Sequence, residues 1–577
     1  MMEPFERIDI QELPLSVPSF RHQVEDFLGS NGLRLGEVDL YMAVLDADGA
    51  ILAGGGLQRD IIKCLAVSPA ARSMGLSVPL ISRLISVAAD RGLTNVKVFT
   101  KPENQAMFDS LGFKLLASAP KAILMENGRC LEDYCAYLRQ HRAAGVIVMN
   151  ANPFTLGHAY LAEQASRAGN LVIIPVKEDA SRFPYEERVK MMREYLGSAV
   201  EVLEGSDYQI SAATFPTYFL KDLSDAAETQ MRLDIDLFGR HIAPALGATM
   251  RFVGSEPTDP LTARYNELMK EMLPAYGVQV VEIPRLTAFE GPVSASRVRE
   301  ALDKGSFREA AAMVPATSWP YLLAELAGRA LGMELDTPMK PGLVGPDSVG
   351  AHADMDYALM RRGIAAIRPF FPRMAMAGGA EELRQLGIDA ERAMMAATGG
   401  VNTHRGAIFA LGLALSVAGR RTEGAESEQV MRSRVCQLAQ SILDKSLTER
   451  ELHSTAASHG GKAVKAYGVK GALQIAKEGY KELFESWLPY YCSVKADSFG
   501  LQRTLLKIMS ELDDTCVIHR VGYERAQKVK SEAKDLLDAF SIEGLQEMNR
   551  RYADEGISPG GAADMLALTI FIDSILH

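Results

Sequence analysis

Hydrophobic and polar positions follow three different patterns along the 577 residues of this chain. Residues 38–125 mix short apolar runs with helical periodicity, as in PLISRLISVAADRG. Residues 145–283 alternate between helical patterns and apolar runs typical of strands, such as GVIVMN and VQVVEIP. After about residue 323 the chain is almost wholly helical, with long stretches of 3.6-residue period. Strands separated by helices indicate a parallel sheet in the middle region.

A chain of 577 residues is far too long for one hydrophobic core. We therefore predict a multidomain protein. An α/β (α+β) region is expected at residues 1–138, an α/β domain with a parallel sheet at residues 139–322, and an all-α domain at residues 323–577. Two prolines in VPATSWPYL (314–322) mark the junction with the helical part.

The composition, with 47% apolar and 23% charged residues, is typical of a soluble globular protein. A formal net charge of −11 argues against a nucleic-acid partner, because phosphates would be repelled. The N-terminus MMEPFERIDI lacks the features of a signal peptide. The longest nearly apolar run, residues 407–419, is too short to span a bilayer, so we expect it to form a buried core helix. We expect a cytoplasmic protein with no membrane partner. The six cysteines form no C-x-x-C pair, so we expect reduced thiols and no zinc site.

The first candidate site lies where strand GVIVMN passes through a short loop into a helix. A helix N-terminus offers backbone N–H groups and partial positive charge to a phosphate. Gly157 lets a phosphate approach the backbone closely, and His158 can stabilise charge that develops at the α-phosphorus. Thr155 can add a hydroxyl donor or cap the helix. The preceding loop residues are expected to contact the nucleotide as well: Asn152, Pro153 and Phe154.

A second motif, VSASRVREAL, places two serines and two arginines at the start of a later helix: Ser294, Ser296, Arg297 and Arg299. They suit the β- and γ-phosphates that leave as pyrophosphate, although a serine-capped surface helix explains the motif alone equally well. In this order, the two motifs resemble the T/H-x-G-H and I-S-x-S-x-x-R signatures of the nucleotidyltransferase superfamily. The resemblance implies a Rossmann-like nucleotidyltransferase domain with ATP as substrate.

Three blocks are similar to those of citrate lyase ligase: MNANPFTLGHAYLAEQA, FVGSEPTDPLTARYN with Gly254, and VSASRVREAL. The resemblance implies ATP-dependent acetylation of the prosthetic-group thiol on the citrate lyase acyl carrier protein. Acetate would attack the α-phosphorus to give acetyl-adenylate and pyrophosphate, and the thiol would then take the acetyl group and release AMP. Mg²⁺ is expected to accompany the triphosphate.

Residues 64–113 resemble the acetyltransferase-like region with which that family begins. Asn104, Phe108 and LGF (111–113) match a late block of such domains. The loop ARSMGLS (71–77) occupies the usual pyrophosphate-binding turn but supplies one glycine, Gly75, where acetyltransferases typically have two. Acetyl-CoA binding and a docking or inactive role therefore both remain open for this region.

The helical half carries polar residues that are unusual for the faces of a helix bundle: Lys340, His352, Asp354, Asp356, Asn402, His404, Arg405, Asp513, Asp514, Arg520 and Asp564. A helix through residues 352–360 would place His352 and Asp356 on one face. Asn402 is expected to cap the helix that contains the apolar run 407–419. Ser558, Pro559, Gly560 and Gly561 predict an exposed helix N-terminus that binds phosphate.

The segments that carry these residues resemble triphosphoribosyl-dephospho-CoA synthase, and the similarity covers most of residues 325–577. That family joins ATP to dephospho-CoA through the ribose and expels adenine, a displacement through an oxocarbenium-like state. The resemblance implies carboxylates for charge stabilisation or Mg²⁺ (Asp354, Asp356, Asp513, Asp514, Asp564), bases (His352, His404), phosphate-binding cations (Lys340, Arg405) and further nucleotide contacts (Asn402, Ser558, Gly560, Gly561). The family usually reads K-P-G-L-V-D, but here Gly345 replaces the Asp, and Asp347 lies two residues later.

We predict a bifunctional enzyme, a ligase and a transferase that both serve citrate lyase maturation. A coenzyme adenylyltransferase of the pantetheine-phosphate type is an alternative, but it leaves the helical half without a role. A carrier-protein docking scaffold with only one active site is a second alternative, and it does not explain two separate phosphate-binding constellations.

Overall fold

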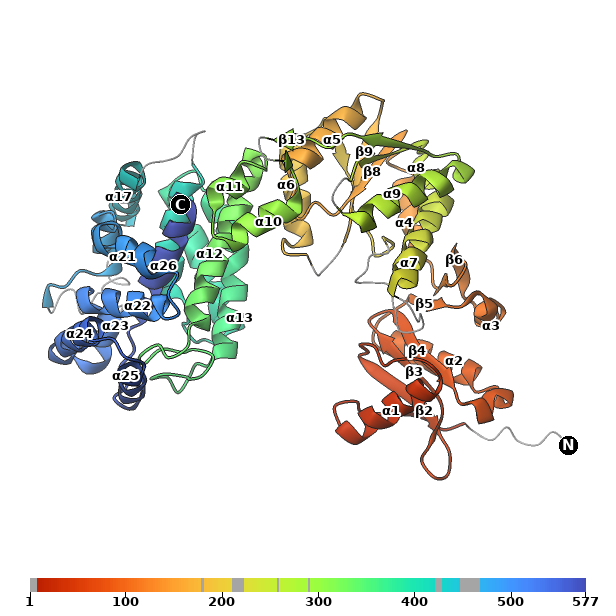
Figure 1. The fold of residues 1–577 in the computed structure, drawn as a ribbon, viewed down its shortest axis with the longest axis horizontal. Helices are drawn as coiled ribbons and strands as arrows, with labels where there is room; N and C mark the ends of the chain where they lie inside the picture. Colours follow the sequence, from red (N-terminus) through yellow and green to blue (C-terminus); the bar gives the residue numbers. More distant parts are fainter. Residues whose placement is uncertain are drawn as a thin grey trace. The chain divides into compact units, whose positions relative to one another are not determined.

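A computed structural model describes residues 8–177, 181–209, 223–256, 259–288, 291–420, 428–446 and 467–577. The chain divides into two compact units, Met1–Val293 and Ser294–His577, which are drawn in Figure 1. The two units meet between residues 293 and 294, whereas the sequence predicted boundaries after residues 138 and 322. Helix α12 (Trp319–Asp336) runs through residue 322, and the expected domain boundaries stay predictions.

The first unit begins with a mixed, seven-stranded sheet in the order β1-β2-β3-β4-β5-β7-β6. Neighbouring strands are antiparallel except for the pair β4–β5. The strands are β1 (Ile10–Glu12), β2 (Leu40–Leu45), β3 (Ile51–Gln58), β4 (Ile61–Val67), β5 (Val96–Thr100), β6 (Lys114–Ser118) and β7 (Ile123–Asn127).

Two helices, α1 (Pro18–Ser30) and α2 (Ser77–Asp90), belong to two separate cores of this sheet. Alternate residues of β2 point to opposite faces, as strand geometry requires. Leu40, Met42 and Val44 pack with the buried face of α2, whereas Tyr41 and Ala43 pack with that of α1.

The second sheet of this unit has five parallel strands in the order β10-β9-β8-β11-β12. The predicted parallel sheet is therefore confirmed. Its strands are β8 (Gly145–Met149), β9 (Leu171–Pro175), β10 (Glu201–Val202), β11 (Met250–Gly254) and β12 (Gln279–Ile283). The helices between and beside them are α5 (Leu156–Ser166), α6 (Tyr185–Leu196), α7 (Leu223–Leu237) and α9 (Pro260–Met272).

The second unit contains only helices over its described residues, as the sequence predicts. The main ones are α10 (Ala295–Asp303), α12, α13 (Tyr357–Ile367), α15 (Ala380–Ala397), α16 (Arg405–Ala418), α17 (Glu428–Ser446), α20 (Ala472–Lys477), α22 (Gly500–Glu511), α23 (Thr515–Val521), α24 (Tyr523–Asp538), α25 (Ile542–Asp554) and α26 (Gly560–Leu576). Helices α12, α16 and α26 pack against one another in the core. The apolar run predicted to be a buried helix is α16, in which all but three residues are buried.

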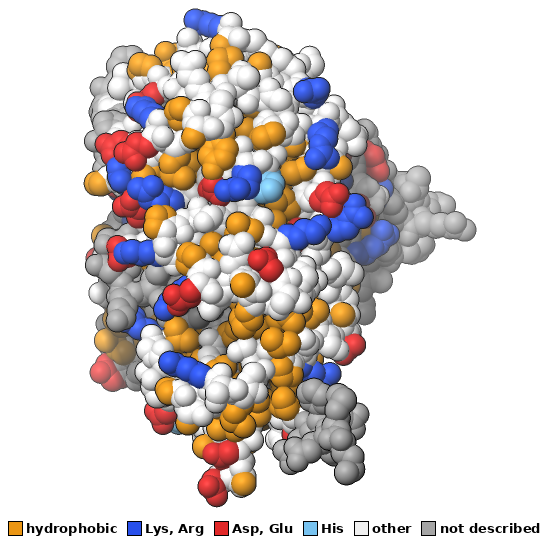
Figure 2. Space-filling model, turned by 90° about the vertical axis from the view of Figure 1, so that its right-hand side faces the viewer, with side chains coloured by type: hydrophobic (Ala, Val, Ile, Leu, Met, Phe, Trp, Pro, Cys, Tyr) orange, Lys and Arg blue, Asp and Glu red, His pale blue; other side chains and the backbone are white. Residues whose placement is uncertain are grey.

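Among the described helices, none is both long enough and apolar enough to cross a membrane. Positive and negative side chains are interspersed on the face of the molecule that Figure 2 shows.

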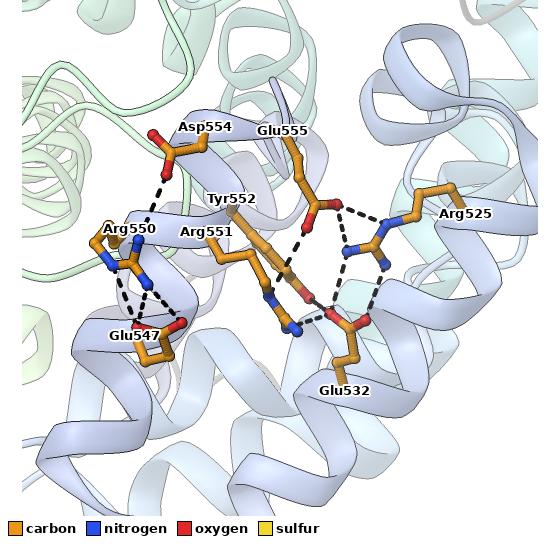
Figure 3. A network of polar contacts seen from close by, with 8 residues as sticks. All are labelled: Arg525, Glu532, Glu547, Arg550, Arg551, Tyr552, Asp554 and Glu555. Carbon is orange, nitrogen blue, oxygen red and sulfur yellow. Dashed lines mark hydrogen bonds and ion pairs between the residues drawn. The ribbon is translucent and has the colours of Figure 1, made fainter.

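A network of ion pairs joins α24 to α25 (Figure 3). The half-buried carboxylate of Glu532 accepts hydrogen bonds from Arg525 (3.0 Å), Arg551 (2.7 Å) and the Tyr552 hydroxyl (2.8 Å). Arg525 also pairs with Glu555 at 2.8 Å. Tyr552 lies near the end of α25, so its bond to Glu532 fixes this helix end. The residues that follow pack against the loop after α12, because a Cβ on Gly342 in that loop would overlap the Ile557 carbonyl.

Replacing Glu532 with Gln should lower the free energy of unfolding of the second unit by about 1–3 kcal/mol, because three donors lose a shared charged acceptor. Both tryptophans, Trp319 and Trp487, lie in this unit, so tryptophan fluorescence during urea denaturation reports on it alone. The matched control is Glu547→Gln, in the separate and more exposed Glu547–Arg550 pair of α25, which should change stability by less than about 0.5 kcal/mol. Equal effects of the two substitutions would contradict this role for Glu532.

Candidate active sites

The first candidate site lies at the carboxyl end of β8, where the order of the parallel sheet reverses. From β8 the chain proceeds to β9 and β10 on one side and then returns to β11 and β12 on the other. Ligands of open parallel sheets bind at such a switch point. Strands β8 and β11 both end here: Gly254 is the last residue of β11, and the loop after β8 leads to the cap Thr155 and to His158 in α5.

Thr155 and His158 form a reciprocal pair at the start of α5. The His158 N–H donates to Thr155 Oγ1 over 3.3 Å, and the Thr155 N–H donates to His158 Nδ1 over 3.0 Å. This is a capping box with His in the place of Glu or Gln. Because Nδ1 accepts from a backbone N–H, the proton of the neutral ring lies on Nε2. The imidazole is therefore held so that Nε2–H is its remaining donor.

His158 is also kept neutral. Removal of the ring from water, followed by the positive charge of Arg285, lowers the pKa of His158 to about 4. The buried ring of Phe154 stacks on the imidazole, with centroids 5.8 Å apart and an interplanar angle of 18°. A neutral, oriented N–H donor suits a developing negative charge and does not titrate near neutral pH.

The other predicted loop residues have structural partners. Ala151 adopts a left-handed conformation with φ of 48°. Asn152 Oδ1 accepts from the Phe183 N–H over 3.0 Å, and Pro153 is buried. A Cβ on Gly157 would lie 3.0 Å from the Val293 carbonyl, so the missing side chain serves packing in this unit. Contact of these residues with nucleotide stays a prediction.

Two charged residues at this site escaped the sequence analysis. Arg285 pairs with the buried carboxylate of Glu256 at 2.7 Å, and its own N–H donates to Ser255 Oγ over 3.0 Å. Glu256 follows β11 and Arg285 follows β12, so adjacent strands bring them together. Two features of the sequence could have indicated these residues: Glu256 lies in the segment FVGSEP, and Arg285 lies two residues after a strand.

The second predicted motif lies at the start of α10, in the other compact unit. Ser294 is the N-cap, and its hydroxyl accepts from the Arg297 N–H over 3.2 Å. Arg299 donates to the exposed Ser296 hydroxyl over 3.1 Å. The serine cap is therefore present, and phosphate binding by this helix stays a prediction.

The second unit gathers several predicted polar residues around the start of α26. Lys340 is buried and donates to the carboxylate and the carbonyl of Glu334, the latter over 2.7 Å. Its charge is thus already balanced. Met339, just before it, has a φ of 55°, which holds this loop in an unusual backbone conformation.

The starts of α16 and α26 approach one another at Gly406 and Asp564. A Cβ on Gly406 would overlap Asp564 Oδ2, so only glycine admits this carboxyl. Loss of water and the nearby Asp514 and Glu334 raise the pKa of Asp564 well above its ordinary value. Burial, followed by the charge of Lys340, lowers the pKa of His404 to about 4.

Asp514 corrects one prediction: the N-terminus of α26 is not exposed, and phosphate binding there stays a prediction. Its buried carboxylate caps α23 by accepting from the Cys516 N–H (2.8 Å) and caps α26 by accepting from the Ala562 N–H (2.9 Å). Gly561 makes this approach possible, because a Cβ there would lie 2.9 Å from Asp514 Oδ1. The turn Ser558–Gly561 is therefore not an exposed anion site: Ser558 is buried, and a carboxylate of this chain already takes the helix N-terminus.

His352 is fixed at both ring nitrogens. Arg520 donates to Nδ1 over 3.0 Å, which leaves the proton on Nε2 to be donated to Ser558 Oγ over 2.8 Å. Burial and the Arg520 charge lower the pKa of His352. The predicted helix from residue 352 was wrong: α13 begins at Tyr357 with Asp356 as its cap. His352 precedes this helix, so the two residues share no helix face. The Asp356 carboxylate accepts from the Leu359 N–H.

The remaining predicted residues have local partners. Asp513 accepts from Lys530 Nζ over 2.7 Å, and both line a small pocket with Asp514. The N-cap of α16 is His404 rather than the predicted Asn402, although Asn402 Oδ1 accepts from the Arg405 N–H at the helix start over 3.1 Å. The Arg405 side chain is exposed and pairs with Glu391.

Asp347 stands next to the position where the family usually has Asp. A Cβ on Gly345 would lie 3.2 Å from Asp347 Oδ1. The other carboxylate oxygen accepts from the Met339 N–H over 3.2 Å. A carboxylate is thus available beside Gly345 although the sequence position has moved.

The candidate Mg²⁺ ligands do not assemble into one cluster within the described ranges. Asp356 and Asp514 bind helix N–H groups, and Asp513 binds Lys530. The group of possible ligands that does come together is Cys492, Asp573 and His577, but Lys495 Nζ lies 2.8 Å from the same Asp573 carboxylate. These residues do not fit a magnesium site by themselves.

Neutral His404 predicts a pH dependence of stability. In the unfolded chain the pKa of His404 returns to about 6.5, so the unfolded state binds a proton below that pH. The folded state binds this proton only below about pH 4. The free energy of unfolding of the second unit should fall by up to about 3 kcal/mol between these pH values. Denaturation followed by tryptophan fluorescence tests this, and His404→Gln should flatten the dependence.

The exposed residue His577 supplies the control, since His577→Gln should keep the steep fall between pH 6.5 and 4. An unchanged slope in His404→Gln would contradict the neutral, buried state of His404.

Comparison with known proteins identifies both parts of the chain. Residues 144–322 match the family described as citrate lyase ligase C-terminal domain, and residues 320–577 match ATP:dephospho-CoA triphosphoribosyl transferase. A citrate (pro-3S)-lyase ligase of Klebsiella pneumoniae is 41% identical over 317 residues, which are 52% of this chain and 92% of that protein. The ligase of Escherichia coli K12 is 40% identical over 316 residues, covering 52% of this chain and 89% of the relative.

The helical part has relatives of another kind. A 2-(5''-triphosphoribosyl)-3'-dephosphocoenzyme-A synthase of Stutzerimonas stutzeri A1501 is 38% identical over 272 residues, which are 44% of this chain and 91% of that protein. Both resemblances predicted from the sequence are therefore confirmed. The chain belongs to two families at once, the citrate lyase ligases and the triphosphoribosyl-dephospho-CoA synthases.

Proposed function

We propose that this chain is a bifunctional enzyme of citrate lyase maturation, in which one part acetylates the carrier-protein prosthetic group and the other makes its precursor. The observation that carries the proposal is the occurrence of two complete family matches on one chain, each with its own cluster of buried polar residues. The adenylyltransferase alternative accounts for only one of them.

In the ligase reaction, an acetate oxygen forms a bond to the α-phosphorus of ATP as the bond to the β-phosphate oxygen breaks. Pyrophosphate leaves, and the carrier thiol then forms a bond to the acetyl carbon and releases AMP. His158 Nε2–H is placed to donate to a phosphate oxygen on which charge increases, because Thr155 fixes the opposite nitrogen. We assign Arg285 to neutralise phosphate charge near this ring, a role supported by its effect on the pKa of His158.

In the synthase reaction, a ribose hydroxyl of dephospho-CoA attacks C1' of the ATP ribose, and the bond from C1' to adenine breaks. The hydroxyl proton passes to a base, adenine leaves with a proton, and the triphosphate stays on the product. The carboxyls near the start of α26 are suited to face the positively charged ribosyl carbon. His352 is a poor candidate for this base, because Arg520 and Ser558 already engage both of its ring nitrogens.

Phosphate binding in this unit falls to exposed cations rather than to Lys340, whose charge Glu334 balances. Arg405 remains a candidate for this role. Mg²⁺ stays an expectation drawn from the family resemblance, and it would be held mainly by the triphosphate itself.

Replacing His158 with Ala should lower AMP and pyrophosphate formation from ATP, acetate and deacetylated carrier protein by about 100-fold or more, because an oriented donor to the transition state is lost. The same protein should release adenine from ATP and dephospho-CoA at the wild-type rate, since that reaction belongs to the other unit. Product chromatography measures both.

The control is His22→Ala, at an exposed histidine outside both candidate sites, which should leave both activities unchanged. Full ligase activity in His158→Ala would overturn the site assignment. Absence of either product from the wild-type protein would overturn that half of the proposed function.

A further inference from the structure

Two buried side chains of the second unit each present a polar atom with no hydrogen-bond partner. They are the hydroxyl of Tyr480, which is 3% exposed, and Nε2 of His404, which is 4% exposed. A buried polar atom without a partner is costly, and native proteins keep few of them. The reaction steps assigned so far leave the Tyr480 hydroxyl without a role.

The Asp564 carboxyl relates to the chain segments of both side chains. It interacts electrostatically with Tyr480 and raises its pKa, after the larger effect of burial. The same carboxyl reaches the backbone at Gly406, two residues after His404. Asp564 and its neighbours Gly561 and Ala563 are only half-buried, so this group of residues reaches the surface along the first turn of α26.

Tyr480 is held in place by its backbone. Its φ of 51° lies in the left-handed region, which is a genuine outlier for a bulky aromatic residue. The preceding Gly479 has a φ of 67°, and a Cβ there would lie 2.8 Å from Cys436 Sγ. Such conformations cluster at functional sites, where the surrounding structure enforces them.

His404 is oriented just as firmly. Its Nδ1 forms a hydrogen bond of 2.8 Å with the Thr403 hydroxyl, which leaves Nε2 as the remaining polar atom. Gly363 makes room for this pair, because a Cβ there would lie 3.0 Å from His404 Nδ1. The side chain of His404 therefore holds Nε2 in a fixed position.

The chemistry of the two atoms selects an uncharged ligand. A phenol hydroxyl and a neutral imidazole carry no charge, and Glu334 balances the nearby cation, Lys340. A triphosphate would be poorly stabilised here. A flat heterocycle with ring nitrogens and an exocyclic amino group offers acceptors and donors to both atoms.

We propose that Tyr480 Oη and His404 Nε2 bind the adenine base of the ATP that the synthase part consumes. This inference rests on the proposed synthase function and deepens it. Tyr480 donates to a ring nitrogen of the base, both in the substrate and as the bond to C1' breaks and electron density moves onto adenine. His404 Nε2 completes the recognition by one hydrogen bond to the same base.

Binding of free adenine to the full-length protein tests the inference without turnover. Isothermal titration calorimetry should detect adenine binding to the wild type, and Tyr480→Phe should weaken it by about 5- to 30-fold, since it removes only the hydroxyl. The variant should also slow adenine release from ATP and dephospho-CoA. His404→Gln should weaken adenine binding as well, with folding checked by tryptophan fluorescence.

The matched control is Tyr490→Phe, at a half-buried tyrosine of the same unit, which should leave adenine affinity unchanged. Hypoxanthine, which lacks the exocyclic amino group, should bind more weakly than adenine. Adenine binding that is undetectable at millimolar concentration, or identical in wild type and Tyr480→Phe, would overturn the inference. If the wild type binds adenine in this way but releases none from ATP, the base site stands and the synthase function fails.

Discussion

An imidazole held neutral beside a cation recurs at each candidate site, and much of the surrounding architecture serves this arrangement. His158 lies near Arg285, His352 next to Arg520, and His404 near Lys340. Burial is the larger cause in each case, and the neighbouring positive charge adds to it. A neutral imidazole offers one oriented hydrogen bond near anionic substrates without changing its charge at physiological pH. Of these cations we assign phosphate neutralisation to Arg285, whereas the charge of Lys340 is balanced by Glu334.

Helix N-termini of this chain serve different purposes, although each offers the same backbone donors. At α5 the cap is Thr155, and the paired His158 orients a side chain toward the switch point of the sheet. At α26 the Ala562 N–H donates to the Asp514 carboxylate, which joins α26 to α23. An N-terminus is therefore an anion site only when no carboxylate of the protein already occupies it.

The pattern of apolar residues predicted the parallel sheet, the helical second half and the buried helix α16, because these follow from local periodicity. The motif TLGH also indicated that Thr155 donates a hydroxyl or caps the helix, and the structure shows the cap; the reciprocal bond with His158 came only from the structure. Contacts between distant segments could not be predicted in this way. Asp514 reaches Ala562 across 48 residues, and Arg285 meets Glu256 only because β11 and β12 are adjacent. Tyr480 was not among the candidate residues taken from the sequence, and its significance comes from burial and backbone conformation.

The claim of two reactions on one chain is tested most directly by ATP that carries ¹⁴C in adenine and ³²P in the α-phosphate. The account predicts that acetate and deacetylated carrier protein yield AMP with both labels. Dephospho-CoA should instead separate the labels, with ¹⁴C in free adenine and ³²P in the triphosphoribosyl product. If only one fate of the labels appeared with all acceptors present, the bifunctional account would be contradicted.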